Sequence, residues 1–151
     1  MLSKVLLFVR LSVVLLVIYT IARFSLGIAG VPYAPRGNAM FSVVGLMLVS
    51  SFYFGALSAT VGKFTWSGTI LVGIVVCSAA EVLVFLATLI SYLGNLNTYF
   101  IHWDALNVPP GTNVPIGKAM MARTAGLIFG PILGILSASL GRVFSRLAPR
   151  A

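Results

Sequence analysis

Acidic side chains are almost absent from this chain of 151 residues. It has two, Glu81 and Asp104, whereas lysines and arginines together number ten. A single cysteine, Cys77, excludes an intrachain disulfide and a cysteine metal cluster. The single histidine, His102, cannot supply both axial ligands of a b-type haem, and the chain has too few ligands for a metal site of its own. We therefore expect no metal and no cofactor.

Catalytic motifs are missing as well. The sequence has no phosphate-binding glycine loop followed by Lys and Ser or Thr, no HExxH, no paired acids and no nucleophile elbow, so we expect it not to be an enzyme. The net charge of +8 would suggest nucleic acid in a soluble protein. No soluble module presents these charges, so we expect no nucleic-acid partner. The charges indicate membrane topology and contact with anionic lipid instead.

Apolar side chains are what the chain has in excess. It is 60% hydrophobic and 8% charged, with a mean hydropathy of +1.09, whereas a soluble domain has about 25% charged residues. A membrane crossing needs about 20 apolar residues. The sequence predicts an all-α integral membrane protein, a four-helix transmembrane bundle forming one domain over residues 1–151. The predicted spans are 5–22, 39–61, 69–92 and 124–141.

The first and fourth spans have irregular features. The first resembles a secretory signal peptide in its basic and then apolar start, but Arg10 splits its apolar region and Thr20-Ile21-Ala22 is a poor cleavage site, so an uncleaved anchor is favoured. The fourth can extend backward to Pro115 with Asn113 as its cap. Pro131 inside it would free a carbonyl and favour a kink.

A polar turn at 63–68 joins the second and third spans, and two longer loops make the other connections. The segment 24–38 is rich in Gly and Pro and predicts irregular backbone. In the third loop, 94–123, the residues 97–107 predict a short interfacial helix with Tyr99, Phe100 and Trp103 at one-turn spacing. The polar group in this loop consists of His102, Trp103 and Asp104. A histidine beside an aspartate can tune a proton, but an interfacial anchor is the favoured interpretation.

Basic residues predict the orientation. With both termini cytoplasmic, that side receives six (Lys4, Arg10, Lys63, Arg142, Arg146 and Arg150), and the other side receives four (Arg23, Arg36, Lys118 and Arg123). Arg142, Arg146 and Arg150 recur every four residues and predict one basic stripe facing anionic lipid. We expect a multi-pass protein of the bacterial inner membrane.

Glu81 is the leading candidate for chemistry, because a carboxylate at membrane depth is costly. Cys77, Gly73 and Thr69 precede it at four-residue steps, so one narrow face of the helix ends in the carboxyl group. Arg10 is the only cation expected inside the membrane, within bridging reach of Glu81. The pattern fits a proton- or cation-coupled site, or an Arg10–Glu81 pair that fixes helix register; the second is favoured.

Small residues recur on three of the predicted spans. On the fourth they follow four-residue spacing, and such stripes let helix backbones approach closely. Packing inside the bundle and contact between subunits are equally compatible with this pattern. The residues are Gly126, Gly130, Gly134 and Ala138 on the fourth span, Ser51 and Gly55 on the second, and Gly73 on the third.

Two functions remain. The first is a non-catalytic accessory or scaffold subunit of a larger bacterial inner-membrane complex, with an electron-transfer complex as its suggested setting. The alternative is a small oligomeric proton- or cation-coupled transporter that uses Glu81. The expected partners are other transmembrane subunits or further copies of this chain, together with anionic lipids on the cytoplasmic side.

Overall fold

Four long helices form the protein in the computed structural model, which describes residues 1–33 and 42–147. Each helix is long and apolar enough to cross a membrane, and the described ranges contain no strand. The prediction of an all-α membrane protein with four spanning helices is confirmed. The helices are α1 (Leu2–Ile28), α2 (Val43–Thr60), α3 (Trp66–Leu93) and α4 (Ile116–Val143).

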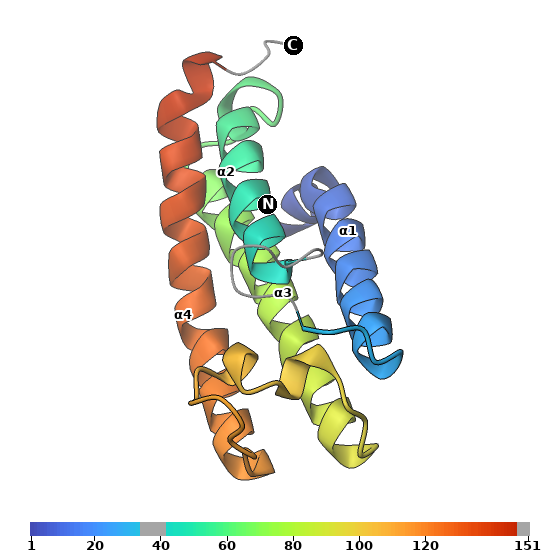
Figure 1. Cartoon of the computed structure of the whole chain (residues 1–151). Helices are drawn as coiled ribbons and strands as arrows, with labels where there is room; N and C mark the ends of the chain where they lie inside the picture. Colours follow the sequence, from blue (N-terminus) through green and yellow to red (C-terminus); the bar gives the residue numbers. More distant parts are fainter. Residues whose placement is uncertain (34–41, 148–151) are drawn as a thin grey trace.

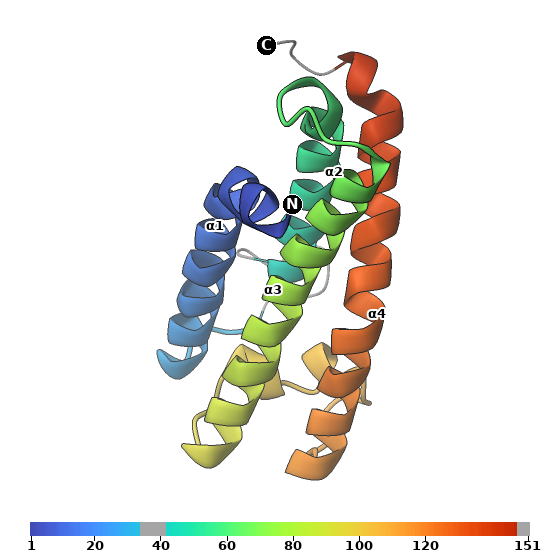
Figure 2. The same ribbon diagram turned by 180° about the vertical axis from the view of Figure 1, so that it is seen from behind.

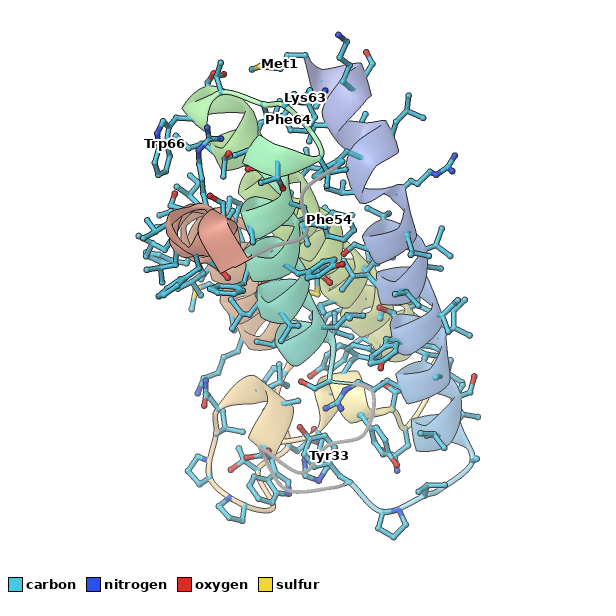
Figure 3. The ribbon with its side chains drawn as sticks, turned by 90° about the horizontal axis from the view of Figure 1, so that it is seen from above. Met1, Tyr33, Phe54, Lys63, Phe64 and Trp66 are labelled. Carbon is cyan, nitrogen blue, oxygen red and sulfur yellow. The ribbon has the colours of Figure 1, made fainter. Side chains whose placement is uncertain are left out.

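Successive helices run in opposite directions, as Figure 1 shows. Helices α2 and α3 lie between α4 on one side and α1 on the other (Figures 1 and 2). The most extensive packing joins α4 to α3 and then α4 to α2, whereas α1 packs on α3 and less on α2. Met1 and the α2–α3 turn at Lys63 share one end of the bundle, and Tyr33 lies at the other (Figure 3).

Helix α1 is longer than the predicted span. It continues through segment 24–28, which was predicted to be irregular, and the N–H of Ala29 still donates to Ser25 O at 2.9 Å. Gly30 then takes a left-handed φ of +73°, which ends the helix. At the start of α2, Ser42 Oγ accepts a hydrogen bond from Gly45 N at 3.1 Å and caps the helix. Residues 39–41 of the predicted second span lie outside the described residues.

Helix α4 has the predicted backward extension, since it begins at Ile116 directly after Pro115. Pro115 occupies the cap position and no side chain caps the helix, so the capping role predicted for Asn113 is wrong. Pro115 itself has extended backbone, with φ −60° and ψ 146°, and precedes the first turn of the helix. The helix continues through Pro131 to Val143.

The third loop does not form the predicted helix over 97–107. It contains two single turns of 3-10 helix, η1 (Tyr99–Ile101) and η2 (Asp104–Leu106), separated by His102 with extended backbone at φ −63° and ψ 140°. Tyr99 and Phe100 are buried at the end of the bundle. The extended backbone at His102 interrupts the helix, so Tyr99 and Phe100 belong to one turn and Asp104–Leu106 to another.

Apolar packing joins the first three helices. Phe8 of α1 meets Phe54 and Phe64 edge to face, each with 5.3 Å between ring centroids. Between helices, Ser51 Oγ lies 3.4 Å from Cys77 Sγ and Ser58 Oγ lies 2.6 Å from Thr69 Oγ1. The buried apolar residues of this core are Val5, Val9, Leu16, Val43, Met47, Val72, Val76, Cys77 and Ala80.

The predicted small-residue stripe lies inside the bundle, where α4 meets α3 and α2. A Cβ atom on Gly134 would lie 2.6 Å from Cys77 Sγ and closer still to the Gly73 carbonyl oxygen, and one on Gly55 would lie 2.6 Å from Ala138 Cα. We call the α3–α4 contact the glycine seam. It is the face of α3 with Thr69, Gly73, Cys77, Glu81 and Thr88 and the face of α4 with Arg123, Gly126, Gly130, Gly134 and Arg142.

Substituting Gly134 by alanine tests the seam. The added Cβ has no space beside Gly73 and Cys77, so we expect Gly134→Ala to destabilise the bundle by about 1–3 kcal/mol. Gly117→Ala is the matched control on the same helix, because a Cβ there meets nothing within 4 Å, and alanine favours helix by about 1 kcal/mol. Thermal unfolding in detergent should separate the two variants, and equal melting temperatures would contradict the close contact.

Candidate functional site

Glu81 lies in the glycine seam, directly against α4. A Cβ on Gly130 would lie 2.5 Å from Glu81 Cγ, and a Cβ on Gly126 would lie 2.5 Å from Glu81 Oε2. The carboxyl group therefore occupies the space that side chains at these two positions would fill. Gly126 and Gly130 thus allow the two helices to approach closely and also leave space for the Glu81 carboxyl group.

Arg123 is the basic group whose charge acts on Glu81. It lies one turn from Gly126 on α4, and its guanidinium donates to Thr88 Oγ1 at 3.0 Å and to the Phe100 carbonyl at 2.8 Å. The sequence placed Arg123 outside the membrane because the predicted fourth span began at 124. The earlier start of α4 makes it part of the same helix as the glycines.

Arg10 is not brought to Glu81. It is exposed on α1, whereas the Glu81 side chain faces α4. Helix α1 packs on α3 and α2 on the opposite side of the bundle from α4. The pairing predicted from helical rise alone matched the depth of the two residues but not their faces.

The seam ends at Arg142, on the side of the chain termini. Its Nη1 donates to the carbonyls of Phe64 and Thr65, both at 3.0 Å, and to Thr69 Oγ1. Its guanidinium lies 4.8 Å from the centre of the Trp66 ring. Arg142 thus binds the α2–α3 turn.

This contact differs from the predicted lipid-facing stripe, because carbonyl groups at the turn offer Arg142 acceptors within the protein. The remaining members of that stripe, Arg150 and the side chain of Arg146, lie outside the described residues.

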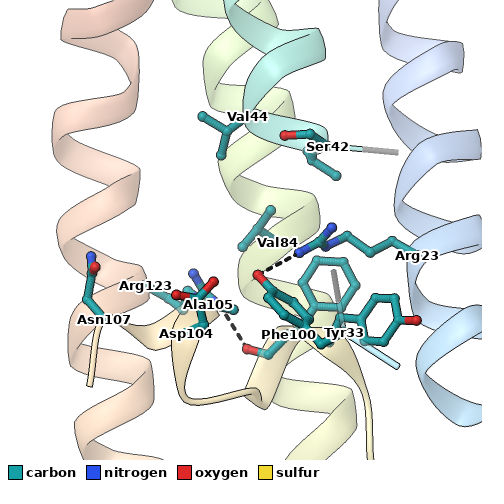
Figure 4. Close-up of a pocket in the computed structure, with 12 residues that line it drawn as sticks. Arg23, Tyr33, Ser42, Val44, Val84, Phe100, Asp104, Ala105, Asn107 and Arg123 are labelled. Carbon is teal, nitrogen blue, oxygen red and sulfur yellow. Dashed lines mark hydrogen bonds between the residues drawn. The ribbon is translucent and has the colours of Figure 1, made fainter. Parts of the chain in front are cut away.

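A cavity of about 460 Å³ lies at the other end of the bundle (Figure 4). All four helices and the third loop contribute to its walls, with Arg23 of α1 and Arg123 of α4 both reaching it. We call it the arginine cavity. Its lining residues are Arg23, Tyr33, Ser42, Val43, Val44, Val84, Tyr99, Phe100, Asp104, Ala105, Asn107 and Arg123.

Aromatic rings hold Arg23 in place. Its Nη2 donates to Tyr33 Oη at 3.0 Å, and its guanidinium carbon lies 5.2 Å and 5.5 Å from the ring centres of Tyr33 and Tyr99. Tyr99 Oη in turn donates to the Val31 carbonyl at 2.6 Å. These contacts tie the segment after α1 to the third loop, although the two are far apart in sequence.

His102 belongs to this wall. Its ring stacks on Tyr33 with 4.0 Å between centroids and an interplanar angle of 10°, and it is tilted against Trp103 at 4.9 Å. Asp104 N donates to His102 Nδ1 at 3.2 Å. Burial lowers the pKa of His102, Asp104 acts against this shift, and the positive charge of Arg23 adds to it. The folded protein therefore favours the neutral form of the His102 imidazole.

The sequence missed Arg23, Arg123, Tyr33 and Tyr99 as a group. It counted the two arginines only for topology, and no spacing joins residues on α1, α4 and two loops. The one available sequence signal was that all four residues are predicted to lie on the same side of the membrane. Within residues 1–33 and 42–147, no three side chains of His, Cys, Asp or Glu lie together as a metal site would require.

A double-mutant cycle tests the interaction of Glu81 with Arg123. Arg123→Gln should destabilise the bundle by about 1.5–3 kcal/mol, because hydrogen bonds from a charged donor are lost. We expect Glu81→Gln and Arg123→Gln to be coupled by at least about 0.5 kcal/mol. Steric-trapping measurements in bicelles give these free energies. The control cycle of Glu81→Gln with Arg10→Gln should be additive, and coupling there but not with Arg123 would contradict the assignment.

Acidification tests the state of His102. Because its pKa is lowered on folding, the unfolded chain binds more protons, and stability is complete above the ordinary imidazole pKa of about 6.5 and falls as the pH drops below it. The variant His102→Phe keeps an aromatic ring stacked on Tyr33 but has no titratable group at this position. We expect the melting temperature of the wild type to fall more steeply with acidity than that of the variant. Parallel profiles would show that His102 contributes nothing to the pH dependence.

Comparison with protein-family models, with curated proteins and with solved structures gave no match. The assignment of a function therefore rests on the arrangement of this chain's own residues.

Proposed function

We propose that this chain is a non-catalytic accessory or scaffold subunit of a larger bacterial inner-membrane complex. The observation that carries the proposal is the exposure of Arg10 on the outer face of α1. A guanidinium among lipid tails costs several kcal/mol and is normally paired or directed to the headgroups. A neighbouring transmembrane subunit with an acid or a free carbonyl would satisfy it.

The surface around Arg10 supports this proposal. Five of the exposed apolar residues on α1 follow one another in steps of four and three, which is also the spacing of a helix that packs along a second helix. Helices α1 and α4 both lie at the outside of the bundle, and α1 packs less extensively on α3 and α2 than α4 does. The exposed row consists of Leu7, Leu11, Val14, Ile18 and Ile21.

The position of Glu81 favours the subunit over the transporter. Its carboxyl group lies between two packed helices, against Gly126 and Gly130, so α4 would have to move away from α3 before a substrate could reach it. The arginine cavity carries Arg23 and Arg123, and their charges repel a cationic substrate. An acid placed in this way sets the register of α3 and α4.

The setting of the complex is part of the same proposal. The start of α1 and the end of α4 both lie near the α2–α3 turn, because Phe8 packs on Phe64 and Arg142 donates to the carbonyls of Phe64 and Thr65. The excess of basic residues at this end supports a cytoplasmic position for both termini. A bacterial inner membrane is the proposed location, and an electron-transfer complex is the narrower form of the proposal. Anionic headgroups on the cytoplasmic side are its proposed lipid contacts.

Purification from the native membrane tests the proposal. We expect native mass spectrometry in mild detergent to show unrelated transmembrane chains in fixed stoichiometry. Arg10→Gln should lower their recovery about tenfold, which corresponds to the loss of about 1.4 kcal/mol of binding. Lys4→Gln removes the same charge from the same exposed helix and should leave recovery unchanged.

Two results would contradict the proposal. One is a homo-oligomer without other subunits, and the other is equal recovery from the Arg10→Gln and Lys4→Gln variants. Flux measurements in vesicles test the alternative, because proton-coupled transport that Glu81→Gln abolishes would establish the transporter instead.

A further inference from the structure

The arginine cavity has a polar end and an apolar side. Figure 4 shows Arg23 and Arg123 approaching from opposite helices near the third loop, with Val84 between them and Val44 farther along the bundle. This order, charged groups at the end of the bundle and aliphatic groups toward its middle, matches a ligand with an anionic head and a less polar body.

The charges of the cavity favour an anion. Among the described lining residues there are two guanidiniums and one carboxyl group, that of Asp104. The charges of Arg23 and Arg123 act on each other, and Glu81, which does not line the cavity, acts on Arg123 as well. Two like charges held over one cavity repel, and an anion between them replaces that repulsion with two attractions.

Both arginines retain hydrogen-bonding capacity. A guanidinium has five N–H groups, and toward the described residues Arg123 uses its Nε and Nη2 while Arg23 uses its Nη2. These bonds also fix the side chains in place, so little freedom is lost when a ligand binds. Rigid forks of this kind match the oxygens of phosphate.

The start of α2 adds a smaller contribution. Ser42, Val43 and Val44 line the cavity, and the N–H groups of a first helical turn have no partner within the helix. Among the described residues, the Ser42 hydroxyl accepts from the N–H of Gly45. The positive end of the helix dipole therefore faces the same space as the two arginines.

We infer that the arginine cavity binds a phosphate ester, with Arg23 and Arg123 as the groups that hold its phosphate. A phosphate offers several oxygens to two arginines at once, and about 460 Å³ is room for more than a bare ion. The ester comes from the headgroup of an anionic phospholipid or from a small soluble molecule. The inference is independent of the proposed subunit role.

Binding to purified protein in nonionic detergent tests the inference. The probes are glycerol 3-phosphate by isothermal titration calorimetry, and phosphatidylglycerol against phosphatidylcholine by native mass spectrometry. We expect Arg23→Gln to weaken binding about tenfold or more, in line with the loss of a charge-assisted bond. Lys118→Gln is the matched control, because Lys118 is exposed at the same end of the bundle but does not line the cavity.

A second variant leaves both arginines in place. Val44 lines the cavity and is 54% exposed, so a larger side chain there need not disturb the core. We expect Val44→Trp to fill the cavity and abolish binding while the melting temperature stays at the wild-type value. This arm remains informative if Arg23→Gln fails to fold.

The outcomes distinguish the two sources. Retention of phosphatidylglycerol but not of glycerol 3-phosphate would assign a lipid headgroup, and the reverse would assign a soluble ester. Wild-type protein that binds neither probe would overturn the inference. So would binding that survives both Arg23→Gln and Val44→Trp.

Discussion

The close contact of α3 with α4 is the constraint on which the rest of the structure depends. Within lipid, helices gain little from the hydrophobic effect on association, so their packing relies on van der Waals contact and on hydrogen bonds between them. Gly73 and Gly134 allow the backbones to meet, and Gly126 and Gly130 leave space for Glu81. A glutamate is tolerated at this depth because the neighbouring helix has no side chain there and carries an arginine one turn away.

An arginine lies at each end of the contact between α3 and α4. Arg142 donates to carbonyls of the α2–α3 turn, and Arg123 donates to the Phe100 carbonyl in the third loop. Both side chains start on α4 and reach a loop attached to α3, so the interface that joins the helices also positions the connections. The arginine cavity follows from this arrangement, because the third loop is held over the end of the bundle by Arg123 on one side and by Tyr99 on the other.

Sequence patterns predicted the elements of this fold but not their partners. Apolar runs gave the four helices, and four-residue spacing gave the face of α3 that ends in Glu81 and the stripe on α4. The partner of Glu81 was predicted as Arg10, because helical rise gives depth and says nothing of which faces meet. Tyr99, Phe100 and Trp103 have a spacing that fits α-helix and 3-10 turns alike. The stacking of Tyr33 on His102 joins segments that no local pattern connects.

The two arginines considered as partners of Glu81 differ in a way that bears on function. Arg123 has hydrogen-bond acceptors within the chain and an acid nearby, so it needs no second protein. Arg10 projects from α1, where the bundle offers apolar neighbours in the exposed row. A stable monomer in lipid needs only the first arrangement. In the proposed subunit role, another membrane protein would supply an acceptor to Arg10, so the outer face of α1, rather than the buried glutamate, is the proposed site of contact with a partner.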